Sequence, residues 1–139
     1  FLSRREHSEQ ELKQKLTRYL ENENDFSILE EVLLFLQTKG YVSNARFCES
    51  YLRAKSTRYG TYYLKQNLRL KGVHDTEIES KLEPYLETER WRAQQIWERR
   101  FHAQDPEDVK QYTKQVRFLQ GRGFSLDIIR QIVKLKKPI

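Results

Sequence analysis

Two blocks of basic side chains carry the clearest chemical signal in this sequence. The first, between residues 51 and 73, holds six basic side chains, four tyrosines and no acidic residue. Guanidinium and ammonium groups beside phenol rings suit a phosphate backbone, or an acidic protein surface with an apolar rim. A solvated helix face is the alternative interpretation, but the absence of acidic residues favours a binding face. The residues predicted to bind are Arg53, Lys55, Arg58, Tyr62, Lys65, Arg69 and Lys71.

The second basic block lies between residues 109 and 139, with eight basic side chains and one acidic one. Its predicted binding residues are Lys114, Arg117 and Arg122. The intervening segment, residues 74–108, holds ten acidic and five basic side chains, so charge is zoned along the chain. The two basic blocks could form one surface or two separate ones, and the sequence leaves both possibilities open.

No arrangement of residues in the sequence is typical of an active site. Cys48 stands alone with no histidine near it, and the three histidines are dispersed without metal-ligand spacing. Gly121 and Gly123 lack the Lys-Ser/Thr sequel of a phosphate-binding loop. We therefore expect Cys48 to be a small core residue, and the protein to be neither an enzyme nor a holder of a metal or cofactor.

Apolar spacing and capping residues predict an all-α chain of roughly eight helices. Ser8 with Glu11, and Ser27 with Glu30, fit capping boxes. Gly40 fits the left-handed turn that closes the second of these helices. The buried face expected for that helix consists of Ile28, Val32, Phe35 and Leu36.

Further along the chain, Asp105-Pro106 predicts a helix start, with a capping aspartate followed by proline in the first turn. Ser125 is expected to cap the last helix. Trp97 lies on an apolar helical face and is predicted to be core. Trp91 lies off that face, and core is still the favoured interpretation, with a partly exposed anchor as the alternative.

The sequence also repeats itself. Residues 12–16 resemble residues 64–68, and the pattern Leu68, Gly72, Val73 recurs as Leu119, Gly123, Phe124. A period of about 50 residues is typical of an array of one supersecondary unit. We expect three modules of three helices, at residues 1–40 (with the first helix truncated), 41–87 and 88–139. Such arrays usually bind macromolecules along an extended surface.

Composition narrows the class of protein. Net charge is +6, hydrophobic residues make up 37% and charged residues 33%, which suits a helical array better than a thick core. No stretch is long and apolar enough for a membrane span, and no signal peptide opens the chain. A single cysteine makes a reducing cytoplasm the simplest compartment. The chain begins Phe1-Leu2 and contains no methionine, which we interpret as a fragment of a longer protein.

Four segments, in order, resemble motifs of the RecX family, bacterial regulators of the RecA recombinase. They are His7-Ser8-Glu9-Gln10-Glu11-Leu12 with Lys15-Leu16; Gly40-Tyr41-Val42 leading to Arg46-Phe47; Arg53 through Gly60 with Leu64, Leu68 and Lys71-Gly72-Val73; and Phe118 through Ser125 with Asp127 and Ile129. The resemblance spans nearly the whole chain. One departure is Ser43-Asn44, where the family usually carries an acidic residue after the Gly-Tyr turn.

The resemblance implies a fold of tandem three-helix repeats in an elongated, curved array. It also implies a monomeric regulator that binds RecA filaments on single- or double-stranded DNA, along the filament groove, and suppresses ATP hydrolysis, strand exchange and co-protease activity. The alternative is a stand-alone helical DNA- or RNA-binding protein, which would show salt-sensitive affinity for bare nucleic acid.

Overall fold

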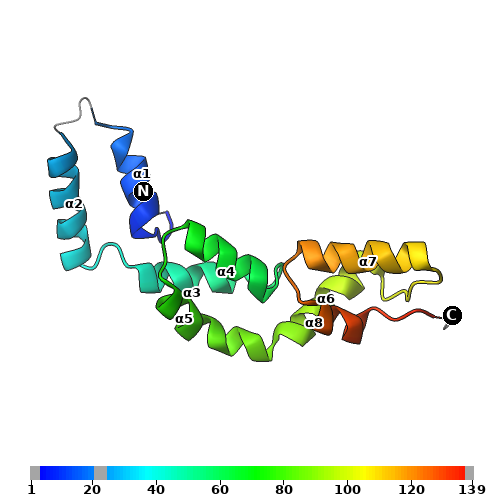
Figure 1. The fold of residues 1–139 in the computed structure, drawn as a ribbon. Coiled ribbons are helices and arrows are strands. Elements are labelled where there is room, and N and C mark those ends of the chain that lie inside the picture. Colours follow the sequence, from blue (N-terminus) through cyan, green and yellow to red (C-terminus); the bar gives the residue numbers. More distant parts are fainter. Residues whose placement is uncertain (1–3, 21–24, 137–139) are drawn as a thin grey trace. The chain divides into compact units, whose positions relative to one another are not determined.

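The chain folds into helices and connecting turns. The structure is a computed structural model that describes residues 4–20 and 25–136, and these residues contain eight α-helices and no strand. The helices are α1 (Glu9–Thr17), α2 (Phe26–Thr38), α3 (Asn44–Lys55), α4 (Thr61–Leu70), α5 (Asp75–Glu87), α6 (Glu89–Phe101), α7 (Val109–Gly121) and α8 (Leu126–Ile132), as Figure 1 shows. The predicted all-α fold class is confirmed.

Two compact units divide the chain, and the division runs through α3, α4 and α5. The first unit comprises residues 1–51 and 67–81, and the second comprises residues 52–66 and 82–139. In the first, α1 and α2 pack as a pair around Leu12, Leu29, Leu33 and Val42. In the second, α6, α7 and α8 form a three-helix cluster (Figure 1). Its core consists of Ala93, Ile96, Trp97, Leu119, Phe124, Ile129, Ile132 and Val133.

The internal repeat is visible in local hydrogen bonding. After α4, the N–H of Gly72 donates to Arg69 and that of Val73 to Leu68, over 3.0 and 3.1 Å. After α7, the N–H of Gly123 donates to Gln120 and that of Phe124 to Leu119, over 2.9 and 3.2 Å. Gly72 and Gly123 have φ of +84° and +94°, the left-handed conformation that this helix ending requires. The two copies of the sequence pattern therefore fold into the same turn.

Several predicted helix ends are confirmed. The Ser8 hydroxyl accepts from the Glu11 N–H while the Glu11 carboxylate accepts from the Ser8 N–H, each over 3.1 Å, which is a complete capping box. Ser125 caps α8 by accepting from the Ile128 N–H. Gly40 follows α2 with φ of +75°. These ends depend on residues close together in sequence, which is why the sequence predicts them well.

The predicted buried face of α2 is wrong at three of its four residues, while the fourth, Leu36, is half-buried and packs against the core of the first unit. Ile28, Val32 and Phe35 are exposed, and Leu29 and Leu33 are buried instead. This helix is apolar on most sides, so two sets of residues fit helical spacing equally and only packing against α1 chooses between them. Ser27 lies inside the helix, because α2 begins at Phe26 after Asp25, so Ser27 is not the N-cap that the predicted capping box requires.

Two other predictions are wrong. The helix expected to start at Asp105-Pro106 begins at Val109, where the carboxylate of Asp108 accepts from the Gln111 N–H over 2.8 Å. Pro106 is buried and its carbonyl accepts from the Lys136 N–H. Trp91 is 65% exposed, because α6 presents Ala93, Ile96 and Trp97 to the core and Trp91 lies off that face.

The repeat makes a quantitative prediction about leucines on α4. Leu68 is fully buried, whereas Leu70, two residues on, is 72% exposed. Leu68→Ala should lower the free energy of unfolding by about 2–5 kcal/mol, whereas Leu70→Ala should change it by under about 0.5 kcal/mol. Urea denaturation followed by circular dichroism measures both. Equal losses of stability in the two variants would contradict the assignment of Leu68 to the buried face of α4 and of Leu70 to its exposed face.

Candidate binding site

The site is built on an end-to-end contact between α7 and α4 within the second unit. α4 begins without a capping side chain of its own, so its first N–H groups need partners from elsewhere. The carbonyls of Arg122 and Gly123, just after α7, accept from the N–H groups of Gly60 and Tyr62 over 2.6 and 3.1 Å. The carboxylate of Glu89 accepts from the Thr61 N–H over 3.2 Å. Carbonyls of the turn after α7 thus satisfy N–H groups at the beginning of α4.

Close approach of the two backbones requires glycine on both sides. A Cβ on Gly60 would lie 2.5 Å from the carbonyl oxygen of Gly123, and a Cβ on Gly123 would overlap the Cβ of Tyr63. Neither neighbour can move away without breaking the hydrogen bonds just described. Gly60 and Gly123 are therefore what lets the turn before α4 sit against the end of α7.

A buried arginine holds the same turn from the other side. The guanidinium of Arg92, on α6, donates to the carbonyls of Ser56 and Tyr59 over 2.9 and 2.8 Å, and to the carbonyl of Tyr85 over 2.8 Å. The carbonyls of Ser56 and Tyr85 lie at the ends of α3 and α5, where helices leave acceptors unpaired, and that of Tyr59 lies in the turn before α4. Burial lowers the pKa of Arg92, while the three carbonyl dipoles and the charge of the nearby Glu89 carboxylate stabilise its charged form. Arg92 thereby fixes residues 56–59 against α6.

The fixed turn brings one residue from each predicted basic block to the same ring. The guanidinium carbons of Arg58 and Arg122 lie 6.0 and 5.2 Å from the ring centre of Tyr59. Tyr59 itself stacks on Tyr63, with ring centres 3.8 Å apart. The guanidinium of Arg122 also lies 5.2 Å from the ring centre of Phe118. Cation–π contacts of this kind favour a single orientation of the guanidinium.

Two further arginines complete a groove beside this ring. Arg100 lies over Phe101 and Phe118, 5.4 and 5.5 Å from their ring centres, and Arg99 donates to the carbonyl of Thr57 over 3.2 Å. The groove has a volume of about 300 Å³. Its lining residues are Thr57, Arg58, Ile96, Arg99, Arg100, Phe118 and Arg122, which we call the arginine groove.

The arginine groove carries uncompensated charge. None of its lining residues is acidic, and no ion pair within the described residues involves any of its four arginines. Four guanidinium groups around an apolar floor repel one another unless an anion lies between them. The geometry is that of a site for a phosphate or a carboxylate, which arginine binds through its planar fork of N–H donors.

Two more predicted residues line a second groove of the same unit. Tyr62 is 68% exposed and Lys65 half-buried, and both border a groove of about 530 Å³ that reaches the α7–α8 turn. Glu89 also lines this groove, so its charge is mixed. It offers a less complete anion site than the arginine groove.

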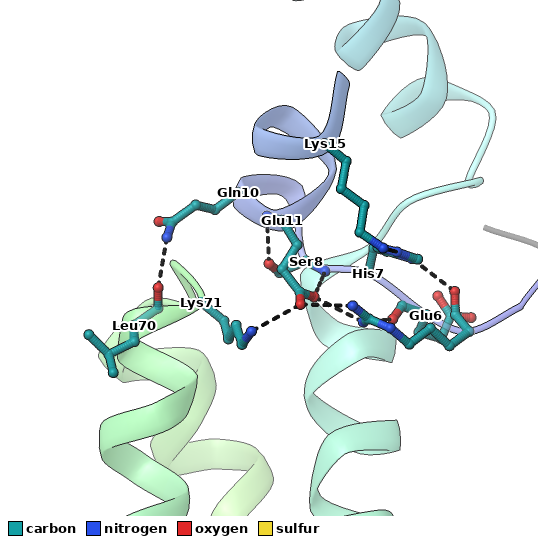
Figure 2. A network of polar contacts seen from close by, with 9 residues as sticks. Glu6, His7, Ser8, Gln10, Glu11, Lys15, Leu70 and Lys71 are labelled. Carbon is teal, nitrogen blue, oxygen red and sulfur yellow. Dashed lines mark hydrogen bonds and ion pairs between the residues drawn. The ribbon is translucent and has the colours of Figure 1, made fainter. Parts of the chain in front are cut away.

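Arg69 and Lys71, in the first unit, are engaged in ion pairs. Arg69 pairs with Asp75 through two hydrogen bonds of 2.7 and 3.2 Å, and the Lys71 ammonium lies 3.2 Å from the Glu11 carboxylate. Figure 2 shows Lys71 pointing to Glu11, and Gln10 beside it donating to the carbonyl of Leu70 over 2.7 Å. In the structure both basic residues are therefore paired with carboxylates of the first unit.

Glu11 is the centre of that network. Burial disfavours its charged form, but hydrogen bonds from the Arg5 guanidinium, the Ser8 N–H and the Lys71 ammonium outweigh burial and lower its pKa from 4.5 to about 2. The adjacent His7 is buried, and its ring nitrogen lies 2.9 Å from the Lys15 ammonium. Burial, with the nearby charges of Arg5 and Lys15, lowers the pKa of His7 and keeps the ring neutral near pH 7.

The remaining predicted residues lie apart from the arginine groove. Arg53, Lys114 and Arg117 are exposed on α3 and α7, and Lys55 is half-buried at the end of α3. Sequence reasoning missed Arg99 and Arg100, because they belong to the segment 74–108, whose summed charge is acidic. A helical-spacing signal was available: Ile96 and Arg100 are four residues apart, so they share one face of α6.

Other candidate chemistry finds no support in the described residues. Cys48 is fully buried, and burial raises the pKa of its thiol to about 11, as expected for a core residue. Among residues 4–20 and 25–136, no three His, Cys, Asp or Glu side chains gather where they could hold a metal ion. No helix within the same residues is long and apolar enough to cross a membrane.

Two family models match the chain. Residues 43–82 match the second three-helix domain of RecX, and residues 92–133 match the third. A regulatory protein RecX from Leptothrix cholodnii is 37% identical over 97% of this chain and 83% of its own length. One from Ralstonia nicotianae is 37% identical over 96% of this chain and 82% of its length, and one from Legionella pneumophila is 36% identical over 96% and 87%.

Solved structures share the fold. A crystal structure of regulatory protein RecX covers 94% of this chain with a TM-score of 0.76 at 23% identity, and this chain spans 65% of it. The crystal structure of RecX from Lactobacillus salivarius covers 94% of this chain with a TM-score of 0.73, also at 23% identity, and this chain spans 86% of it.

The Glu11 network predicts a pH-dependent stability difference. Because the pKa of Glu11 is about 2 in the folded protein and 4.5 ordinarily, its contribution is complete above pH 4.5 and disappears as pH falls toward 2. Glu11→Gln should lower the free energy of unfolding at pH 7 by about 2–3 kcal/mol. Urea denaturation between pH 7 and 3 should show this deficit shrinking as pH falls.

The control is Glu9→Gln, which removes the same charge from the same first turn of α1. It should cost well under about 1 kcal/mol at pH 7. A Glu11→Gln deficit that is constant from pH 7 to pH 3 would contradict the assignment of a low pKa to Glu11.

Proposed function

Because the chain belongs to the RecX family, we propose that it is a negative regulator of the RecA recombinase. In this proposal it binds the RecA–DNA filament, in the filament groove, and inhibits ATP hydrolysis, strand exchange and co-protease activity. The observation that carries it is the identity of 37% over 97% of the chain to a regulatory protein RecX. The protein acts by binding, as a cytoplasmic monomer, and catalyses no reaction of its own.

The basic surfaces supply a physical means of binding. A RecA–DNA filament presents DNA phosphates, and the arginine groove offers four guanidinium groups without an acidic neighbour in its lining. The predicted contacts on Arg53, Lys55, Lys65, Lys114 and Arg117 add positive charge elsewhere on the second unit, and such charges accelerate association with a polyanion. Three modules, at residues 1–40, 41–87 and 88–139, would present these surfaces in series.

A direct assay tests the proposed function. We expect the protein, at equimolar or lower concentration, to depress the DNA-dependent ATPase of RecA and its strand exchange. ATP hydrolysis on circular single-stranded DNA measures the first, and product formation on gels measures the second. Unchanged rates at several-fold excess of a cooperatively melting protein would contradict the proposal.

A second candidate is a stand-alone DNA- or RNA-binding protein. The uncompensated arginines favour it, since they need only a polyanion. It predicts tight binding to bare nucleic acid that falls steeply with salt, with no added effect of RecA. Comparing affinity for bare single-stranded DNA and for a RecA filament on the same DNA distinguishes the two functions.

A further inference from the structure

We propose that the arginine groove is a binding site for the sugar-phosphate backbone of single-stranded nucleic acid. The inference rests on the proposed function in one respect: the proposed partner, a RecA–DNA filament, contains the nucleic acid that this site would contact. It goes further in assigning the contact to Arg58, Arg99, Arg100 and Arg122. Two of these lie outside the basic blocks of the sequence.

The arginines are oriented before any ligand binds. Arg100 and Arg122 each have two aromatic rings within 5.5 Å of the guanidinium carbon, and Arg58 has one at 6.0 Å. A ring beside a guanidinium restricts its rotation and leaves N–H groups in its plane available. Less side-chain entropy is then lost on binding, and planar N–H pairs match two oxygens of a phosphate.

The backbone around the groove favours a nucleic acid over an extended peptide. The groove is lined by the sides of α6 and α7, whose N–H and C=O groups are paired within their helices, and by the turn at Thr57 and Arg58. An extended peptide would find few backbone partners there, and its own amides would be left unpaired against Ile96 and Phe118. A phosphodiester strand carries no such amides.

The apolar floor favours a single strand over a duplex. Ile96 and the ring of Phe118 lie between the charged rims. In a duplex the faces of the bases are stacked on one another, whereas a single strand can turn the face of a base onto an apolar floor while its phosphates meet the arginines. The groove therefore provides both contacts that single-strand binding uses.

The test compares two doubly substituted proteins of equal charge. Arg100→Gln with Arg122→Gln removes two guanidinium groups from the groove, and the control, Arg90→Gln with Arg130→Gln, removes two exposed ones that do not line it. Binding to a fluorescein-labelled oligothymidylate is followed by anisotropy at several salt concentrations. We expect the groove variant to bind about tenfold more weakly, and its salt slope to fall by about 0.7 for each phosphate that it no longer neutralises. The control should change affinity by less than about threefold.

Three results would overturn the proposal. The first is equal affinity of the groove variant and the control variant. The second is absence of oligothymidylate binding by the wild-type protein at low salt. The third is a loss of binding to labelled polyglutamate, but not to oligothymidylate, in the groove variant, which would make the groove a peptide site.

Further measurements distinguish a loss of binding from a loss of folding, and the groove assignment from the proposed function. Circular dichroism melting checks that each variant is folded. If the double groove variant does not fold, the single variant Arg58→Gln, in the exposed turn, replaces it, with Arg90→Gln as its control. Arg100→Lys with Arg122→Lys keeps the charge but loses the planar fork, and should bind between the wild type and the glutamine variant. An arginine-dependent affinity for oligothymidylate without any effect on RecA would contradict the proposed function and leave the groove assignment standing.

Discussion

The end of α7 and the beginning of α4 depend on each other for their hydrogen bonds. Gly60, Thr61 and Tyr62 have N–H groups that α4 cannot satisfy, and they find acceptors on Arg122, Glu89 and Gly123. A backbone hydrogen bond that replaces one with water contributes about 0.5–1.5 kcal/mol, so these bonds together favour the contact between the two helix ends. Arg92 adds a second restraint, because its guanidinium satisfies carbonyls of the turn that leads into α4. The position of Arg58 relative to Arg122 follows from these bonds.

Local signals in the sequence predict local structure well. The Ser8 capping box and the turns at Gly72 and Gly123 involve residues within six positions of one another, and all form as expected. The face of α2 could not be predicted, because its apolar residues surround the helix and only the contact with α1 selects Leu29 and Leu33. The site could be predicted in part: the basic blocks indicate Arg58 and Arg122, but their meeting at Tyr59 depends on residues more than 60 positions apart.

Charge summed along the sequence is a poor guide to charge at a surface. Lys71 belongs to a segment without acidic residues, yet it lies 3.2 Å from the Glu11 carboxylate, which comes from another helix. Arg100 belongs to an acidic segment, yet the groove that it lines contains no carboxylate. Coulombic interaction depends on distance in space and on exposure to water, and a helix separates neighbours in sequence onto opposite faces. Placement by the fold, rather than block composition, therefore identifies the sites available to an anion.

Arg122 links ligand binding to the contact between the helices. Its carbonyl accepts from Gly60, while its guanidinium lies over Tyr59 and Phe118 at the rim of the groove. A ligand that bridges Arg58 and Arg122 can do so only while the turn before α4 lies against the end of α7. Such a ligand stabilises the docked arrangement in proportion to the logarithm of its concentration over its dissociation constant. A strand of nucleic acid bound here would therefore stiffen this part of the chain.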